Sequence, residues 1–317
     1  MKHSLQVTIF IVALFFIAQL VGLLTMNKHI LVEVDEATGV VLIAHPDTVL
    51  GPAPVVENKS SSFVMIMLIV LLGTAVLLVL VKYKVYSVWK YWFLLAVWAT
   101  IAVFLGVYIQ NGWIAAALAL ALALLKVFKK GIWVHKLTEI FIYSGIVIIL
   151  LPLFNMFSVL ALLVIISIYD VIAVWKTKHM VSLANFQTKA NLFAGLALPY
   201  HKPASAGTKA IHAHSSSHAA HHKSVNESGE KKHAVLGGGD IAFPLLFSGA
   251  VMESLIGFAG YGKAAALGLT GIVTVCVTAS LFLLLYKAKE DKFYPAMPFL
   301  SLGCIIGYLI IRGIMLL

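Results

Sequence analysis

The sequence predicts an all-α polytopic membrane protein with nine transmembrane helices. Of its 317 residues, 61% are hydrophobic and only 11% are charged, and the mean hydropathy is +0.99. Soluble globular domains carry about 25% charged residues, so this composition excludes a soluble fold. Long apolar runs alternate with short stretches that contain many of the lysines, which is typical of a chain that crosses a membrane repeatedly.

The length of each apolar run identifies the spans. A transmembrane helix requires about 20 mainly apolar residues, and somewhat shorter runs are tolerated. Nine runs satisfy this requirement, at residues 5–26, 63–81, 91–109, 113–128, 137–154, 157–175, 240–258, 264–286 and 295–314. The first run is too long for a signal peptide and no small-residue cleavage site clearly ends it, so we interpret it as an uncleaved helix.

The fifth and sixth spans need a separate argument, because residues 140–175 are almost continuously apolar and only Pro152 and Asn155 interrupt them. Lys136 precedes this stretch and Lys176 follows it. Lysines are enriched on the cytoplasmic side of a membrane, and placing both of these there requires two crossings. The stretch is therefore predicted to form two helices.

Lysines also determine the predicted orientation, because they gather in alternate connections. The connections that we assign to the cytoplasm contain Lys2, then Lys82, Lys84 and Lys90, then Lys126, Lys129, Lys130 and Lys136, then Lys176 and Lys178, then Lys287, Lys289 and Lys292. The longest of the other connections, residues 27–62, is acidic. The N-terminus is therefore expected in the cytoplasm and the C-terminus outside. With no recognisable targeting signal, the cell membrane of a prokaryote is the simplest location.

One cytoplasmic connection, residues 176–232, is much longer than the others and is rich in Ser, Ala, Lys and His. Its centre has no helical or strand period, so a flexible insert is predicted at about residues 185–232. The flanking runs 181–183 and 192–198 are apolar enough to continue the sixth helix or to dock against it on the membrane surface. We expect an N-terminal bundle of spans one to five at residues 1–154, and spans six to nine with the insert at 155–317.

The composition also limits the cofactors and partners. The net charge of +10 does not indicate nucleic-acid binding, because the lysines outside the insert lie beside apolar runs, where they meet anionic lipid head groups. Cys276 and Cys304 lie within apolar runs and predict neither a disulfide nor a zinc site. The insert histidines follow no regular element, so a solvated tract is favoured over a metal site; they are His212, His214, His218, His221 and His222. No metal or organic cofactor is expected.

Two aspartates lie within predicted spans. Asp170 precedes Lys176 by six residues, which places it about 9 Å below the cytoplasmic boundary. Asp240 begins the seventh span, eight residues after Lys232. Because these spans are antiparallel neighbours, both carboxyl groups are expected at similar depth. A charged residue inside a span costs about 2.5–3.5 kcal/mol on insertion scales, so such residues indicate a functional site first.

Two carboxyl groups close together in a low-dielectric site cannot both ionise readily, so one keeps a proton. The ionised group can then activate a water while the protonated group polarises a carbonyl, as in aspartic proteases. Other interpretations stay open at this point. The aspartates could only join helices by hydrogen bonds or pair with lysines, they could carry protons or cations in a transporter or channel, or the chain could be a scaffold for membrane partners.

The residues around Asp240 favour hydrolysis of a peptide. Pro244 has no N–H for the carbonyl of Asp240, which loosens the first helical turn. The glycine run 237–239 allows another backbone to approach closely. A peptide within the membrane is helical and must unwind before water can attack it. The strand-prone stretch 233–236 could then pair with the unwound substrate as an added strand.

Three short motifs resemble those of a known family. Tyr169-Asp170 matches its YD motif, Gly237-Gly238-Gly239-Asp240 its GxGD motif, and Pro295-Ala296-Met297 is a counterpart of its PAL motif. From about residue 60 onward, these motifs and their order on spans six, seven and nine resemble the presenilin type of intramembrane aspartyl protease. The similarity is greatest to the small archaeal homologues.

This resemblance implies a nine-helix presenilin-like fold in an archaeal cell membrane, with Asp170 and Asp240 as the catalytic dyad. Transmembrane proteins or peptides would be the substrates. The residues expected to shape the site and hold the substrate are Tyr169, Leu236, Gly237, Gly238, Gly239, Pro295, Ala296 and Met297. All motifs lie in one chain, so no partner subunit is needed, while self-association stays open.

The chain departs from the family pattern at Met297, where the motif has Leu. Leu to Met conserves volume, so packing should survive, but the motif then does not determine substrate preference at this position. The related signal peptide peptidases share the YD and GxGD motifs and have the opposite membrane orientation. The lysine distribution favours the presenilin orientation.

Two further acidic residues have simpler explanations. Glu139 lies one helical turn from Lys136, which predicts an interfacial ion pair. Glu253 is 13 residues beyond Asp240, about 20 Å along the helix, and is therefore too distant to join the dyad. We expect it to pair with Lys263 or Arg312.

Overall fold

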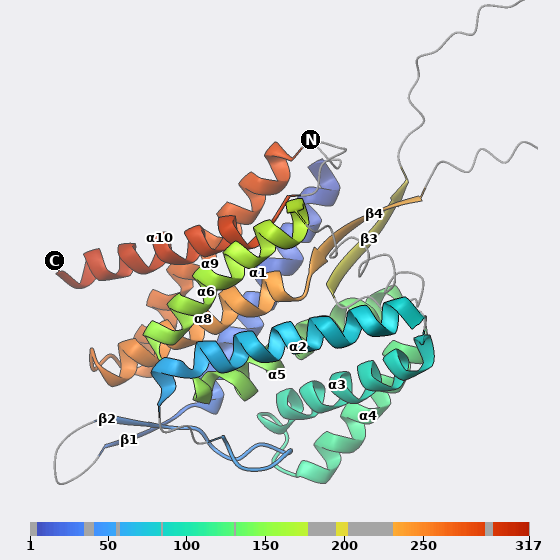
Figure 1. Ribbon diagram of the computed structural model, residues 1–317. Coiled ribbons are helices and arrows are strands. Elements are labelled where there is room, and N and C mark those ends of the chain that lie inside the picture. Colours follow the sequence, from blue (N-terminus) through green and yellow to red (C-terminus); the bar gives the residue numbers. More distant parts are fainter. Residues whose placement is uncertain are drawn as a thin grey trace, which may run out of the picture.

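The computed structural model describes residues 5–34, 41–54, 58–83, 85–129, 131–176, 195–201, 231–288 and 294–316. These residues contain nine α-helices (Figure 1). Eight of them are long and apolar enough to cross a membrane, and the remaining apolar helix has 17 residues. That length is at the lower limit for a span, so the predicted fold class is confirmed.

Each helix corresponds to one predicted span, with its ends displaced by a few residues. The helices are α1 (Leu5–His29), α2 (Ser62–Tyr83), α3 (Tyr86–Gly106), α4 (Gly112–Phe128), α5 (Ile132–Leu150), α6 (Met156–Val171), α8 (Gly239–Gly257), α9 (Lys263–Lys287) and α10 (Met297–Leu316). A π-helical turn, Ile172–Lys176, continues α6 and begins two residues after Asp170. Single π-helical turns occur frequently at functional sites.

The boundary between α5 and α6 lies at the two interruptions in the long apolar stretch. Pro152 lies in a 3-10 turn that ends α5, and Asn155 caps α6. The Asn155 side chain accepts a hydrogen bond from the Ser158 N–H, and the Ser158 hydroxyl accepts one from the Asn155 N–H, each at 2.9 Å. This capping box satisfies backbone donors at the helix start, so the two-helix interpretation is confirmed.

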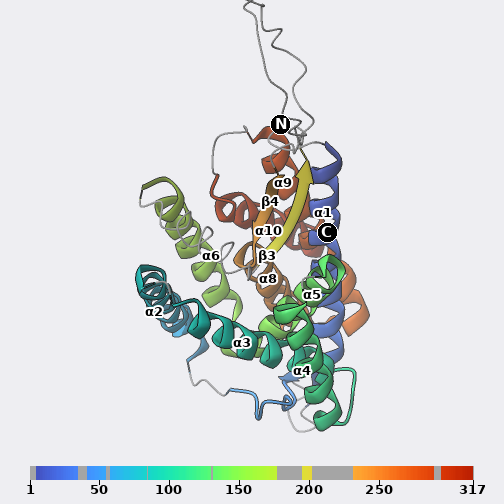
Figure 2. The same ribbon diagram turned by 90° about the vertical axis from the view of Figure 1, so that its right-hand side faces the viewer.

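The centre of the bundle is formed by α5 and α8. Of the spanning part of each of these helices, 72% is buried inside the protein, against 6% for α2. Helix α8 packs against α1, α5, α6, α9 and α10, and α6 also packs against α2 and α10. Figure 2 shows α8 and α10 between α6 on one side and α1 on the other. The helix that carries Asp240 in its first turn is therefore surrounded by other helices.

Two glycines bring α10 close to α9. A Cβ on Gly303 would lie 2.9 Å from the Cα of Val277, and a Cβ on Gly307 would lie 2.7 Å from the Cα of Val273. These glycines are four residues apart and therefore lie on one face of α10. Small residues at this spacing allow membrane helices to pack at short distance, where dispersion forces hold them together.

Two antiparallel hairpins accompany the helices. In the predicted outer loop, β1 (Leu31–Val34) pairs with β2 (Val41–Ala44). At the other end of the molecule, β3 (Gly195–His201) pairs with β4 (Lys231–Gly237), which joins the two ends of the long insert (Figure 1). The expectation that residues 192–198 could continue the sixth helix is therefore wrong for residues 195–198, which form a strand. Residues 181–183 and the five insert histidines lie outside the described residues.

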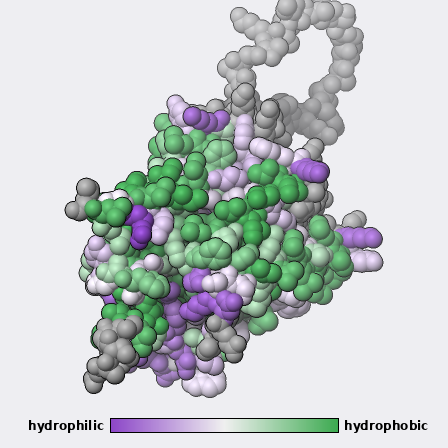
Figure 3. All heavy atoms as spheres, turned by 60° about the vertical axis from the view of Figure 1, so that its left-hand side comes forward, coloured by the Kyte–Doolittle hydropathy of each residue, from purple (hydrophilic) through white to green (hydrophobic). Residues whose placement is uncertain are grey.

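The surface agrees with a membrane environment. Figure 3 shows hydrophobic residues over most of the middle of one face, with hydrophilic residues gathered toward its lower end. Leucines on α2 are largely exposed, at 61% for Leu68 and 67% for Leu72. Exposed apolar area on this scale is unfavourable in water and favourable in lipid. The protein is an integral, multi-pass membrane protein.

We expect Gly307→Val to lower the free energy of unfolding by about 1–3 kcal/mol, because the new side chain would push against the backbone of α9. Gly313→Val is the matched control, since a Cβ on Gly313 in the same helix meets no atom within 4 Å. Denaturation of both variants in detergent micelles measures the difference. Equal stability of the two would contradict close α9–α10 packing.

Candidate active site

The two intramembrane aspartates lie on neighbouring helices. Asp170 is near the end of α6 and Asp240 is in the first turn of α8, and these helices pack against each other. Their carboxyl groups are close enough to interact electrostatically. Asp170 is buried, with 7% of its surface exposed, while Asp240 is partly exposed. The structure thus brings together the two residues that the sequence singled out.

The start of α10 holds the carboxyl group of Asp170. The Met297 N–H donates a hydrogen bond to Asp170 Oδ2 at 3.1 Å, and the Ala296 N–H also donates to this carboxyl group. The first N–H groups of a helix have no partner within that helix, and the helix dipole favours a negative charge beside them. The segment that begins at Pro295 therefore acts on Asp170 through its backbone.

A serine pair joins α6 to α10 next to this contact. The hydroxyl oxygens of Ser167 and Ser301 are 2.8 Å apart, and the Ser301 hydroxyl also reaches the carbonyl of Leu163 at 3.5 Å. Ser167 is three residues before Asp170, on the same side of α6. This contact keeps the start of α10 in register with Asp170.

The end of β4 holds Asp240. The Gly237 N–H donates to Asp240 Oδ2 at 3.2 Å. A Cβ on Gly237 would lie 3.2 Å from the same oxygen, so a glycine permits this approach. Gly238 and Gly239 lead from the strand into α8, and Leu236 is buried in the core. The GxGD motif therefore joins a strand to a helix and positions the carboxyl group between them.

Tyr169 makes a different contribution from the other predicted site residues. Its hydroxyl donates to the Thr74 hydroxyl on α2 at 3.4 Å, which links α6 to α2. This contact directs the hydroxyl toward α2.

Gln19 of α1 is a site residue that the sequence analysis missed. Its Nε2 donates to the carbonyl of Ile241 at 2.9 Å, one residue after Asp240. The side chain is fully buried, and Pro244 follows in the same region of α8. Gln19 lies deep in the apolar first span, whereas Gln6 lies at its start, and an amide in the middle of a span was a signal that could have identified it. Its partner on α8 was not visible in the sequence.

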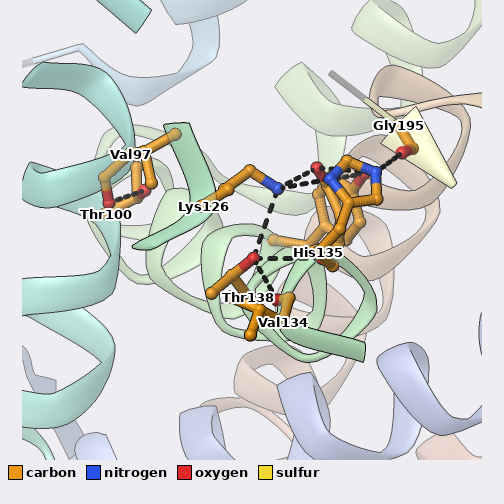
Figure 4. A network of polar contacts seen from close by, with 9 residues as sticks. Val97, Thr100, Lys126, Val134, His135, Thr138 and Gly195 are labelled. Atoms are coloured by element: carbon orange, nitrogen blue, oxygen red, sulfur yellow. Dashed lines mark hydrogen bonds and ion pairs between the residues drawn. The ribbon is translucent and has the colours of Figure 1, made fainter. Parts of the chain in front are cut away.

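A network of buried polar side chains lies between α4 and α5, and Figure 4 shows it from close by. Lys126 on α4 forms an ion pair with Glu139 on α5, with Nζ 2.5 Å from Oε1. The hydroxyl of Tyr143 donates to the other oxygen of Glu139. Tyr143 is buried and interacts electrostatically with Asp240. This network therefore lies near the Asp240 carboxyl group, on the side of α5.

Both predicted ion pairs of the other acidic residues are wrong. Lys136 lies over the rings of Phe10 and Trp133, at 4.3 and 5.0 Å from their centroids, while Lys126 takes its place beside Glu139. Glu253 lies 3.1 Å from Nε2 of His45, just after β2. Both acidic residues pair with side chains that the sequence did not indicate, because packing decides which side chains meet.

Among the described residues, no group of three or more His, Cys, Asp or Glu side chains is placed to hold a metal ion. The donors at the site are backbone N–H groups, hydroxyls and carboxyl groups. Two carboxyl groups that interact inside a membrane bundle can exchange protons with a bound water and with a peptide carbonyl. This arrangement defines the class of intramembrane aspartyl proteases.

Comparison with known proteins leads to the same class. A family model described as signal-peptide peptidase, presenilin aspartyl protease matches residues 12–315. The chain belongs to this family, and its activity is that of an intramembrane aspartyl protease. The resemblance recognised from the three motifs is thereby confirmed, and nothing supports the transporter interpretation.

Solved structures share the fold. The structure of a presenilin family intramembrane aspartate protease in space group C222 gives a TM-score of 0.61 at 17% identity, covering 97% of this chain and 99% of that chain. Another in space group P2 gives a TM-score of 0.56 at 17% identity, covering 96% of each chain. A sequence search of curated proteins finds no match.

We expect Lys126→Met to lower the free energy of unfolding by about 3–5 kcal/mol, because Glu139 would remain charged and buried without its cation. The double variant Lys126→Met, Glu139→Gln removes both charges and should recover most of this loss. Unfolding in detergent micelles measures both. If the single and double variants were equally unstable, Lys126 and Glu139 would not act as a pair.

Proposed function

We propose that this protein hydrolyses peptide bonds inside transmembrane segments of membrane proteins, with Asp170 and Asp240 as its catalytic carboxyl groups. The observation that supports this assignment is the interaction of the two carboxyl groups across the α6–α8 interface. Each also accepts a hydrogen bond from backbone N–H groups, which restricts its orientation. Preorganised acid and base groups of this kind lower the barrier to hydrolysis.

The proposed reaction uses one water and no covalent intermediate. The ionised carboxyl group removes a proton from the water while the water oxygen attacks the carbon of the peptide carbonyl. The protonated carboxyl group gives its proton to the carbonyl oxygen. The first carboxyl group then passes the proton taken from water to the peptide nitrogen, and the second recovers a proton from a hydroxyl of the tetrahedral intermediate. The C–N bond breaks and releases two fragments, one with a new carboxyl end and one with a new amine.

The substrate must expose its peptide bond before this reaction can start. A transmembrane substrate is helical, with its backbone groups paired internally, so it has to unwind near the site. One edge of β4 is already paired with β3, which leaves the other edge for an unwound segment to add as a strand. The residues proposed to line the substrate path are Tyr169, Leu236, Gly237, Gly238, Gly239, Pro295, Ala296 and Met297.

We also propose the orientation and organisation that the sequence predicted. The N-terminus would lie in the cytoplasm and the C-terminus outside, in a prokaryotic, archaeal-type cell membrane. Residues 155–317 would form the catalytic part and residues 1–154 the bundle beside it. The lysine distribution supports this orientation, because lysines are enriched in cytoplasmic connections. One of the lysine-containing connections lies between the helix ends that carry Asp170 and Asp240.

Asp170→Asn and Asp240→Asn should each lower the cleavage rate by about 10²–10⁴-fold, because neither amide can exchange a proton with water as a carboxyl group does. The test uses purified protein in liposomes with a single-span substrate, and mass spectrometry of the fragments. Glu253→Gln is the matched control, since it changes another carboxyl group on α8 and should retain activity. Undiminished cleavage by either Asn variant would remove that residue from the mechanism.

Single cysteines test the orientation. In a background without Cys276 and Cys304, Leu316→Cys should react with a membrane-impermeant maleimide in intact cells, since Leu316 is 86% exposed. Lys129→Cys, in the exposed connection after α4, should react only after lysis. The reverse labelling pattern would instead indicate the opposite membrane orientation.

A further inference from the structure

We propose that His135 is a positioning residue, which anchors the β3–β4 hairpin to α5 and thereby holds Asp240 in its working position. His135 lies near the start of α5, away from the carboxyl pair along the chain. Its side chain joins the buried network around Lys126 to the first residue of β3 (Figure 4). The inference rests on the proposed function only in its claim about cleavage.

The contacts of Lys126 determine which ring nitrogen of His135 carries the proton. An ammonium group has three donors and no acceptor. Lys126 Nζ lies 2.5 Å from Glu139 Oε1, 3.2 Å from His135 Nδ1 and 3.3 Å from Thr138 Oγ1. All three donors are therefore used, and His135 Nδ1 must accept. The proton of the neutral ring is then on Nε2.

That proton connects α5 to the hairpin. His135 Nε2 lies 3.1 Å from the carbonyl oxygen of Gly195, which accepts the hydrogen bond. Gly195 is the first residue of β3, and its partner across the hairpin is Gly237. The Gly237 N–H is the group that donates to Asp240 Oδ2. Each link in this path from Lys126 to Asp240 is a direct contact or a strand pair.

The same network also comes near Asp240 from the side of α5. Glu139 accepts hydrogen bonds from Lys126 and from the Tyr143 hydroxyl, and Tyr143 interacts electrostatically with Asp240. Helix α5 therefore places polar groups near Asp240, while the hydrogen-bonded path to its carboxyl group runs through the hairpin.

The hairpin depends on the His135–Gly195 hydrogen bond because it packs against few of the described helices. Strand β3 contacts α1 and α5, and β4 contacts α8, while the far ends of both strands lead into the insert. The His135–Gly195 hydrogen bond is placed at the inner end, directly opposite Gly237. Without this bond, we expect the hairpin end to move and the Gly237 N–H to leave Asp240.

The experiment compares His135→Ala, His135→Gln and Leu137→Ala in the full-length protein. Gln keeps an N–H donor that can reach the Gly195 carbonyl, and Leu137 is an exposed residue of the same helix with an apolar side chain. Hydrogen–deuterium exchange of the peptide covering residues 231–240 reports on the hairpin. Cleavage of a single-span substrate in liposomes gives kcat and KM.

For His135→Ala we expect about 2–10-fold faster exchange at residues 231–240, as for the loss of one hydrogen bond. We also expect kcat to fall by about 10-fold or more with KM changed less than 2-fold, because misplacement of a reacting group acts on the chemical step. His135→Gln should stay within about 2-fold of the wild type in exchange and in kcat. Leu137→Ala should match the wild type.

Several results would overturn the inference. One is wild-type exchange in His135→Ala; another is a loss in His135→Gln as large as in His135→Ala. A fall in kcat for His135→Ala together with exchange accelerated throughout the helices would indicate general destabilisation and would also reject it. If the wild-type protein cleaves nothing, the proposed function fails, while the exchange comparison still decides whether His135 anchors the hairpin.

Discussion

The hydrogen bonds from backbone N–H groups to Asp170 and Asp240 are the interactions on which the site depends. A carboxyl group inside a membrane bundle is stable only when donors satisfy it, and a helix start or a strand end has N–H groups without partners. Asp170 uses the start of α10, and Asp240 uses the end of β4. Each carboxyl group thus needs an element other than its own helix in the correct place.

This requirement explains why contacts away from the carboxyl groups affect the site. The Ser167–Ser301 contact and the glycines of α10 set the position of the start of α10 relative to α6 and α9. Gln19 holds the first turn of α8 from α1. In a low-dielectric interior, such polar contacts between helices are costly to leave unsatisfied, so each favours one helix register.

The β3–β4 hairpin extends the same logic to the insert. Its strands join residues on both sides of a long connection, and their pairing places Gly195 opposite Gly237. The two buried leucines beside this pair, Leu196 and Leu236, attach the hairpin to the core. Polar groups on α5 then meet the hairpin at its inner end, so the fold couples α4 and α5 to a carboxyl group on α8.

The sequence by itself determined the number of spans, the α5–α6 boundary and the two aspartates, because apolar length, capping residues and intramembrane charge are local properties. Only the tertiary structure decided that residues 195–201 form a strand, that Lys126 pairs with Glu139, and that Gln19 meets α8. These contacts join segments far apart in the chain. Which side chains meet depends on helix packing and strand register, and a single sequence does not encode either in its local pattern.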